Sequence, residues 1–142
     1  MGAKVSILFV IGILASVFPV SGGPLLAHWS VEDQPGGIAV GPGGEVYVTI
    51  NNSHKVVKYS PDGEVLAEWD VDGVIETNGI AVGPGGEVYV TINNSHRVVK
   101  YSTDGEKLDE WSVEGMMNGI AAGPNGLVYI SFTNRMIQVF GA

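Results

Sequence analysis

Two copies of the tetrapeptide Asn-Asn-Ser-His, at residues 51–54 and 93–96, carry the side chains of this sequence that are best suited to chemistry. The imidazole nitrogens of His54 and His96 could bind a divalent cation such as zinc, with carboxylates as further ligands. A histidine that recurs with a longer repeat is more simply explained by the turn that contains it. We therefore prefer the structural interpretation and keep the metal site as the alternative.

No other arrangement of residues in the sequence is typical of a catalytic centre. The chain of 142 residues has no cysteine, which excludes disulfides and thiolate metal sites. No serine, histidine and aspartate are spaced as a recognisable nucleophile system. The glycine-rich run 41–44 opens no helix, so it predicts a turn between strands and not a phosphate cradle. We expect no cofactor other than the divalent cation considered above, and binding is favoured over catalysis.

A repeat of about 40 residues organises the chain. The segment 37–49 recurs without change at 79–91, and a looser copy spans 119–131. Trp29, Trp69 and Trp111 recur in step with these copies. Such a period is typical of repeat architectures in which each unit packs on its neighbours.

Each unit is expected to form four antiparallel strands joined by tight turns. In the first unit the turns fall at 42–44, 51–54 and 61–63, where proline, asparagine and glycine concentrate. The strands between them carry apolar side chains on both faces, so each sheet needs neighbours on both sides. The sequence therefore predicts an all-β chain of β-propeller blades at about 37–69, 79–111 and 119–140, with residues 24–29 as an extra outer strand.

The motifs of the first unit resemble an NHL repeat. They are the runs 37–40, 46–48, 54–59 and 62–63, and His96-Arg97-Val98 in the second unit is closer still to the family's pattern. The resemblance implies a propeller of about six blades, of the TolB-like kind. Ile50 and Ile92 depart from it, because the family often has aspartate there, and the third unit is one residue shorter between its second and third strands.

Three blades are too few for the ring that this resemblance implies. Residues 24–29 resemble the fourth strand of a unit, and the third unit stops after its third strand. We expect two chains to form a six-blade homodimer in which each N-terminal strand completes the other chain's last blade. A partial propeller, or a truncated inactive fragment that forms an open arc, is the alternative.

Polar side chains gather on one face of the expected blades. The turns between second and third strands share that face with the connections from one blade to the next, because strands alternate in direction. Loops on a rigid scaffold commonly carry binding sites. The candidate residues are Asn51, Asn52, His54, Asp72, Glu76, Asn93, Asn94, His96, Asn134 and Arg135.

The N-terminal segment predicts export. Lys4 is followed by an uncharged apolar run and then by small residues, which is typical of a signal peptide over residues 1–22, with an uncleaved membrane anchor as the alternative. The remaining chain has 6 basic and 15 acidic residues and a net charge of −9, which argues against nucleic acid as a partner. We expect a secreted or extracytoplasmic module that binds a protein or a small ligand, with a metal-dependent lactonase or lyase of the same architecture as the alternative.

Overall fold

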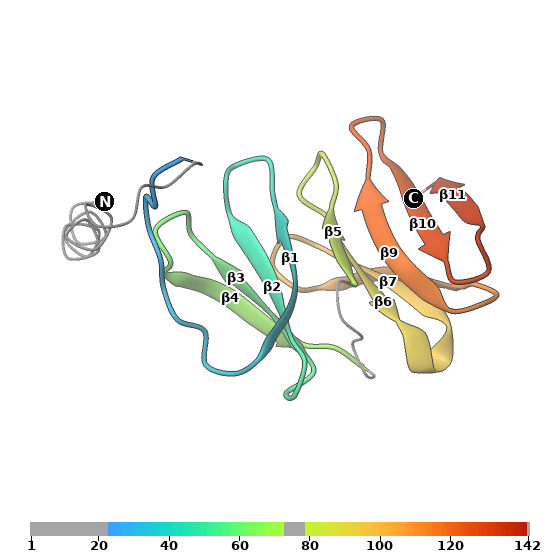
Figure 1. The fold of residues 1–142 in the computed structure, drawn as a ribbon, viewed down its shortest axis with the longest axis horizontal. Helices are drawn as coiled ribbons and strands as arrows, with labels where there is room; N and C mark the ends of the chain where they lie inside the picture. The colour runs from blue at the N-terminus through green and yellow to red at the C-terminus, as the bar shows by residue number, and fades with distance from the viewer. Residues whose placement is uncertain (1–22, 73–78, 142) are drawn as a thin grey trace.

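Three antiparallel sheets follow one another along the chain (Figure 1). The structure of the protein is a computed structural model, which describes residues 23–72 and 79–141. We call the sheets blade 1, blade 2 and blade 3. Blade 1 consists of β1 (Pro35–Val40), β2 (Val46–Ile50), β3 (Lys55–Tyr59) and β4 (Val65–Asp70), paired in that order.

The same strand pattern recurs in the other blades. Blade 2 consists of β5 (Ile80–Val82), β6 (Val88–Ile92), β7 (Arg97–Tyr101) and β8 (Lys107–Ser112), with a 3-10 turn, η1 (Asn93–Ser95), between β6 and β7. Blade 3 consists of β9 (Met117–Ala122), β10 (Leu127–Phe132) and β11 (Ile137–Gly141), with β10 in the middle. The prediction of an all-β chain with four-stranded antiparallel sheets is confirmed by blades 1 and 2.

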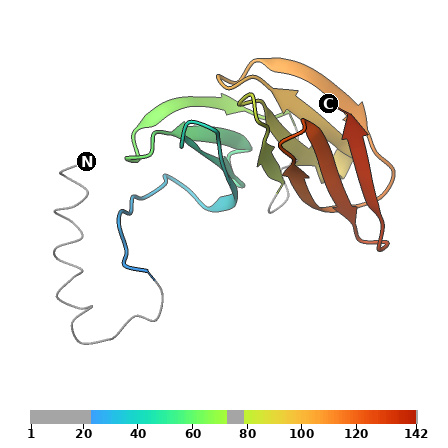
Figure 2. The ribbon, with the colours of Figure 1, turned by 90° about the horizontal axis from the view of Figure 1, so that it is seen from above.

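The blades stack through their faces along a curve (Figure 2). Strands β1, β5 and β9 lie side by side across the blades, so the first strand of each blade is the innermost one. We call the face of a blade that meets the next blade its leading face, and the opposite face its trailing face. Side chains alternate between the two faces because successive residues of a strand point in opposite directions.

Apolar side chains fill both spaces between blades. Tyr47 and Val56 on the leading face of blade 1 pack in one cluster with Val88 and Val90 on the trailing face of blade 2, and all four are completely buried. Burial of each such aliphatic side chain stabilises the fold by about 1.5–3 kcal/mol. The blade stack is therefore held together mainly by these faces.

The tryptophans of the outer strands link each blade to the next. Trp69 on β4 packs against Tyr101 of blade 2 with ring centroids 5.7 Å apart, and Trp111 on β8 packs against Phe140 of blade 3 at the same distance. Gly105 lies under the Trp69 ring, where an added β-carbon would collide with the indole, and its φ of +95° also favours glycine.

Residues 24–29, predicted as an extra outer strand, form no strand in the structure. A strand needs a sheet edge to pair with, and the described part of the chain places none beside this segment. The predicted signal peptide or anchor at residues 1–22 lies outside the described residues. Within 23–72 and 79–141, no helix has the length and apolar character needed to cross a bilayer.

Candidate binding face

The β2–β3, β6–β7 and β10–β11 turns lie at the lower ends of the blades in Figure 1, and the described ends of the connections between blades, at Val71 and Val113, lie beside them. We call this surface the loop face. Its two kinds of loop are joined by backbone hydrogen bonds: the Val71 N–H donates to the His54 carbonyl, and the Val113 N–H donates to the His96 carbonyl, both at 2.8 Å. The structure thus brings together the loops that the sequence analysis had assigned to one face.

The two candidate histidines share an unusual backbone conformation. His54 and His96 both have φ of +51°, in the left-handed region, and Arg135 takes this conformation in blade 3 with φ of +71°. Few residues other than glycine and asparagine adopt it readily. The conformation of the turn therefore fixes the position of these three residues. The His96 Nδ1 lies 3.0 Å from the Gly115 carbonyl.

The candidate asparagines have different environments. Asn93 is 7 % exposed, and its side-chain amide donates to the Met117 carbonyl at 3.0 Å and accepts from the Met117 N–H at 3.1 Å. It therefore attaches blade 2 to the first strand of blade 3. The Oδ1 of Asn51 is buried without a hydrogen-bond partner among the described residues. Asn52 and Asn94 are exposed at the same place in successive blades.

Asp33, which precedes blade 1, extends the exposed polar surface around Asn52. The Asn52 side chain donates to the Asp33 carboxylate at 3.0 Å, and the Gln34 N–H donates to it at 2.7 Å. These hydrogen bonds, the backbone one first, lower the pKa of Asp33 below its usual value. The carboxylate is therefore anionic at neutral pH and contributes to an acidic loop face.

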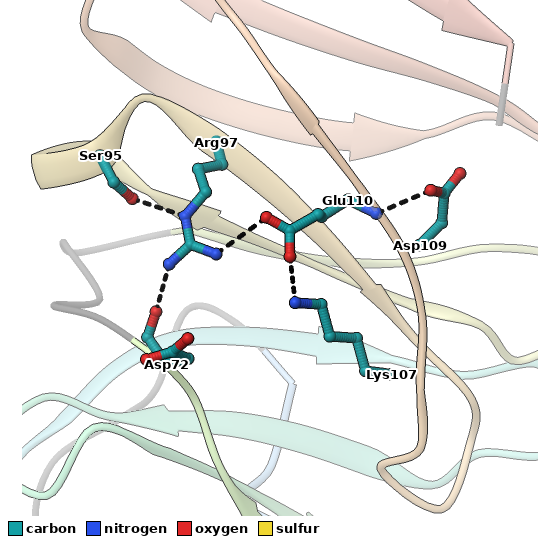
Figure 3. Close-up of polar contacts among 6 residues, drawn as sticks. All are labelled: Asp72, Ser95, Arg97, Lys107, Asp109 and Glu110. Carbon is teal, nitrogen blue, oxygen red and sulfur yellow. Dashed lines mark hydrogen bonds and ion pairs between the residues drawn. The ribbon is translucent and has the colours of Figure 1, made fainter.

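Arg97 forms the densest polar network of the described residues (Figure 3). Its Nε donates to Ser95 Oγ at 2.8 Å, its Nη1 donates to Glu110 Oε2 at 3.0 Å, and its Nη2 donates to the Asp72 carbonyl at 2.5 Å. Lys107 pairs with the other oxygen of Glu110. Lys107 first, and then Arg97, holds the pKa of Glu110 below its usual value.

Lys55 occupies the position of Arg97 in blade 1. It pairs with Glu68 on β4 at 3.3 Å and with Glu32 from the segment before β1. The hydrogen bond to Glu32 is the largest of the causes that raise the pKa of Lys55. Sequence reasoning missed both networks. A signal was present, because a basic residue opens the third strand of the first two units and a glutamate follows 13 residues later in each.

The remaining candidates lie on the loop face without forming one cluster. Asp72 and Arg135 are exposed, and Asn134 Oδ1 accepts from the Met136 N–H at 3.2 Å. Glu76 lies outside the described residues. The described segments hold no group of three or more histidine, aspartate or glutamate side chains that could bind a metal ion. The loop face therefore presents repeated polar turns and exposed carboxylates.

Comparison with known proteins identifies the fold. No protein-family model and no curated protein matches the chain. Hydrazine synthase of Kuenenia stuttgartiensis is 22 % identical, with a TM-score of 0.67 over 87 % of this chain and 36 % of that chain. A catalytically inactive virginiamycin B lyase from Staphylococcus aureus with quinupristin is 17 % identical, with a TM-score of 0.56 over 82 % of this chain and 44 % of that chain.

A third similar structure is a protein complex. BBS1N in complex with ARL6DN is 15 % identical to this chain, with a TM-score of 0.64 over 80 % of this chain and 39 % of that chain. The similar structures are β-propellers, and the likeness shows that the three blades have this fold. This chain spans less than half the length of each of the three.

Proposed function

We propose that this chain is an exported propeller module of the NHL-repeat type whose loop face binds a protein partner. The observation that carries the proposal is the duplication of one surface. Asn52 and Asn94 are exposed in turns of identical sequence, and these turns end in histidines with the same φ. A partner that contacts both turns at once must itself be extended or carry repeated groups.

The charges of the loop face indicate the chemistry of that partner. Glu32, Asp33, Asp72 and Glu114 are exposed there. The basic side chains Lys55 and Arg97 are engaged in the ion pairs described above. Arg135 is the exposed basic side chain among the candidate residues, and the acidic groups outnumber it, so the surface left to a partner is net acidic, which favours an extended basic segment and disfavours nucleic acid.

Two further observations support the proposal. One of the similar propellers, BBS1N, is a protein-binding domain in its complex with ARL6DN. The pattern of residues 1–22 is typical of a signal peptide, which supports export.

Selection of peptides against the purified protein tests this function. A displayed random-peptide library is expected to yield lysine- and arginine-rich extended peptides, and the best of them is then titrated by calorimetry. The double variant Asn52→Ala, Asn94→Ala removes two hydrogen-bonding groups worth about 1 kcal/mol each, so the affinity should fall about 10- to 30-fold.

The control is Glu64→Ala, an exposed acidic residue in the β3–β4 turn at the opposite end of blade 1. This variant is expected to bind the peptide as the wild type does. Peptides without basic enrichment, or equal loss of affinity in the control, would contradict the proposal.

Catalysis at the same face is the second candidate function, and its support is the similarity to virginiamycin B lyase. In this alternative His54 and His96 hold a divalent cation. Calorimetric titration with Zn²⁺ and Mn²⁺ tests it, with His54→Asn as the variant, since asparagine tolerates a positive φ. Binding at micromolar metal that this variant abolishes would favour an enzyme, and no binding would exclude this site.

A further inference from the structure

The two ends of the blade stack expose the same pair of faces that are buried in its interior. On the leading face, Tyr47 and Tyr89 are 0 % and 1 % exposed, whereas their counterpart Tyr129 in blade 3 is 36 % exposed. On the trailing face, Ile80 of blade 2 is 5 % exposed, whereas Ile38 of blade 1 is 68 % exposed. Because leading faces pack on trailing faces inside the stack, the leading face of blade 3 is suited to pack on a trailing face like that of blade 1.

The segment before blade 1 occupies the place of an outer strand that belongs to a preceding blade. Trp29 packs against Tyr59 with ring centroids 5.9 Å apart and an angle of 47° between the rings. Trp69 makes the same contact with Tyr101 of blade 2, at 5.7 Å and 46°. Gly63 lies under Trp29 as Gly105 lies under Trp69.

Blade 3 offers the sheet edge that this segment lacks. In blades 1 and 2 the third strand pairs with an outer fourth strand, whereas β11 has no strand on its outer side among the described residues. A groove of about 420 Å³ also lies open between Trp29 and the trailing face of blade 1, where Ile38, Val46 and Val48 line it. The leading face of another blade would fill this groove.

We propose that a second copy of this chain fills these places, so that residues 24–29 of each copy form the outer strand beside β11 of the other. The leading face of blade 3 then packs on the trailing face of blade 1 of the partner copy. This interface joins two different surfaces, the leading face of one copy and the trailing face of the other. Two copies close a ring when the blade stack of each curves through half a turn, and other curvatures give a filament. The proposal does not depend on which partner the loop face binds.

Side chains at the two ends differ from their counterparts in the interior in a way that suits a second copy. Inside the stack, Lys58 lies 3.0 Å from Thr103 Oγ1 and pairs with Asp104, and Tyr47 shares a hydrogen bond with Thr103. The position of Lys58 is held by Val139 in blade 3, since Val139 pairs with Tyr129 as Lys58 pairs with Tyr47.

The matching change lies at the other end of the stack. Pro61 holds the position of Thr103, since both follow the serine that opens the turn after the third strand. The lysine and the threonine of the interior contact are thus replaced by valine and proline at the two ends, while Asp62 keeps the place of Asp104. Tyr129 contacts its own blade instead, with its hydroxyl 3.5 Å from Asn125 Nδ2.

Crosslinking between two single-cysteine variants tests the strand exchange directly, because the natural chain has no cysteine. In the interior, Lys58 pairs with Ala67, so Val139 of one copy should lie beside Ala27 of the other. We expect a disulfide-linked dimer when Ala27→Cys and Val139→Cys are mixed and oxidised, and little when either is oxidised alone. A mixture of Ala27→Cys with Leu108→Cys is the control, and equal crosslinking there would overturn the proposal.

Light-scattering mass provides the second measurement. The wild type is expected at twice the mass of the chain. Val139→Glu should be a monomer because it faces Asp62, the counterpart of Asp104, whereas Val139→Lys should remain a dimer because it can form the Lys58–Asp104 type of pair. Leu108→Glu, an exposed apolar position in the middle blade, should not change the mass. A monomeric wild type, an open polymer or equal effects of Val139→Glu and Val139→Lys would each overturn the proposal.

Discussion

Replacement of Asn93 by alanine should destabilise blade 3, because it removes a buried link between blades 2 and 3. The side chain makes two hydrogen bonds with the backbone of Met117, and both residues are buried. Each of the two buried backbone groups of Met117 that loses its partner costs about 1–3 kcal/mol. Because the site can relax in part, we expect a loss of about 2–5 kcal/mol in the free energy of unfolding.

Urea denaturation at one protein concentration, followed by tryptophan fluorescence, measures this loss. Asn94→Ala is the matched control, because its exposed side chain neighbours Asn93 in the same turn. Surface substitutions of this kind usually change stability by less than about 0.5 kcal/mol. If the two variants differ by less than that amount, the assignment of Asn93 as the link between blades 2 and 3 is wrong.

Hydrogen exchange locates the effect of Asn93→Ala. Stacked repeats interact mainly with their neighbours, so loss of one link should free the blade beyond it before the whole stack unfolds. Backbone amides of β9, β10 and β11 are expected to exchange faster, and those of β2 and β3 should be unchanged. Uniformly faster exchange would show that the link acts on the entire stack.

Two further predictions concern a glycine and the tyrosines. Gly105→Ala should lower the free energy of unfolding by about 2–5 kcal/mol, because it combines the positive φ with displacement of the Trp69 ring. Gly126→Ala, at φ of +81° with no neighbour within 4 Å, should lower it by about 1–2 kcal/mol. Equal shifts of the two variants in thermal unfolding would contradict this difference. Burial raises the pKa of Tyr89 and Tyr101 above the ordinary value of 10.0, so their contribution to stability is complete below pH 10 and is lost as the pH rises through the raised pKa. Urea denaturation should therefore give a lower free energy of unfolding at pH 11 than at pH 9, and equal values would contradict this.

Local pattern was enough to predict the strands of each blade. The alternation of valine, tyrosine and threonine in 46–50 and 88–92 has the period of a strand, and proline, asparagine and glycine mark the turns between. Strand pairing followed, because short turns leave consecutive antiparallel strands as neighbours. The repeat then implied the stacking of blades, since each strand is apolar on both faces.

The contacts between blades could not be predicted in the same way. Asn93 was selected as a binding residue because the pattern shows only that a polar turn exists, and not that the first strand of the next blade passes beside it. Glu32 and Lys55 are 23 residues apart, and their pairing depends on the path of the segment before β1. Residues 24–29 have the pattern of a strand, but a strand forms only where a partner edge is present.

The departures of blade 3 from the repeat argue for an apolar neighbour on its leading face. In stacked-repeat proteins, a terminal unit that faces water usually has a polar outer surface. The leading face of blade 3 is instead less polar than those of the other blades, because Val139 stands where they have a lysine. Ile137, the counterpart of the buried Val56, is 69 % exposed on the same face. Exposed apolar groups beside an unpaired strand invite association. Within the chain, a leading face packs on a trailing face twice. Packing of the leading face of blade 3 on the trailing face of blade 1 of a second copy covers both exposed ends with the same kind of contact.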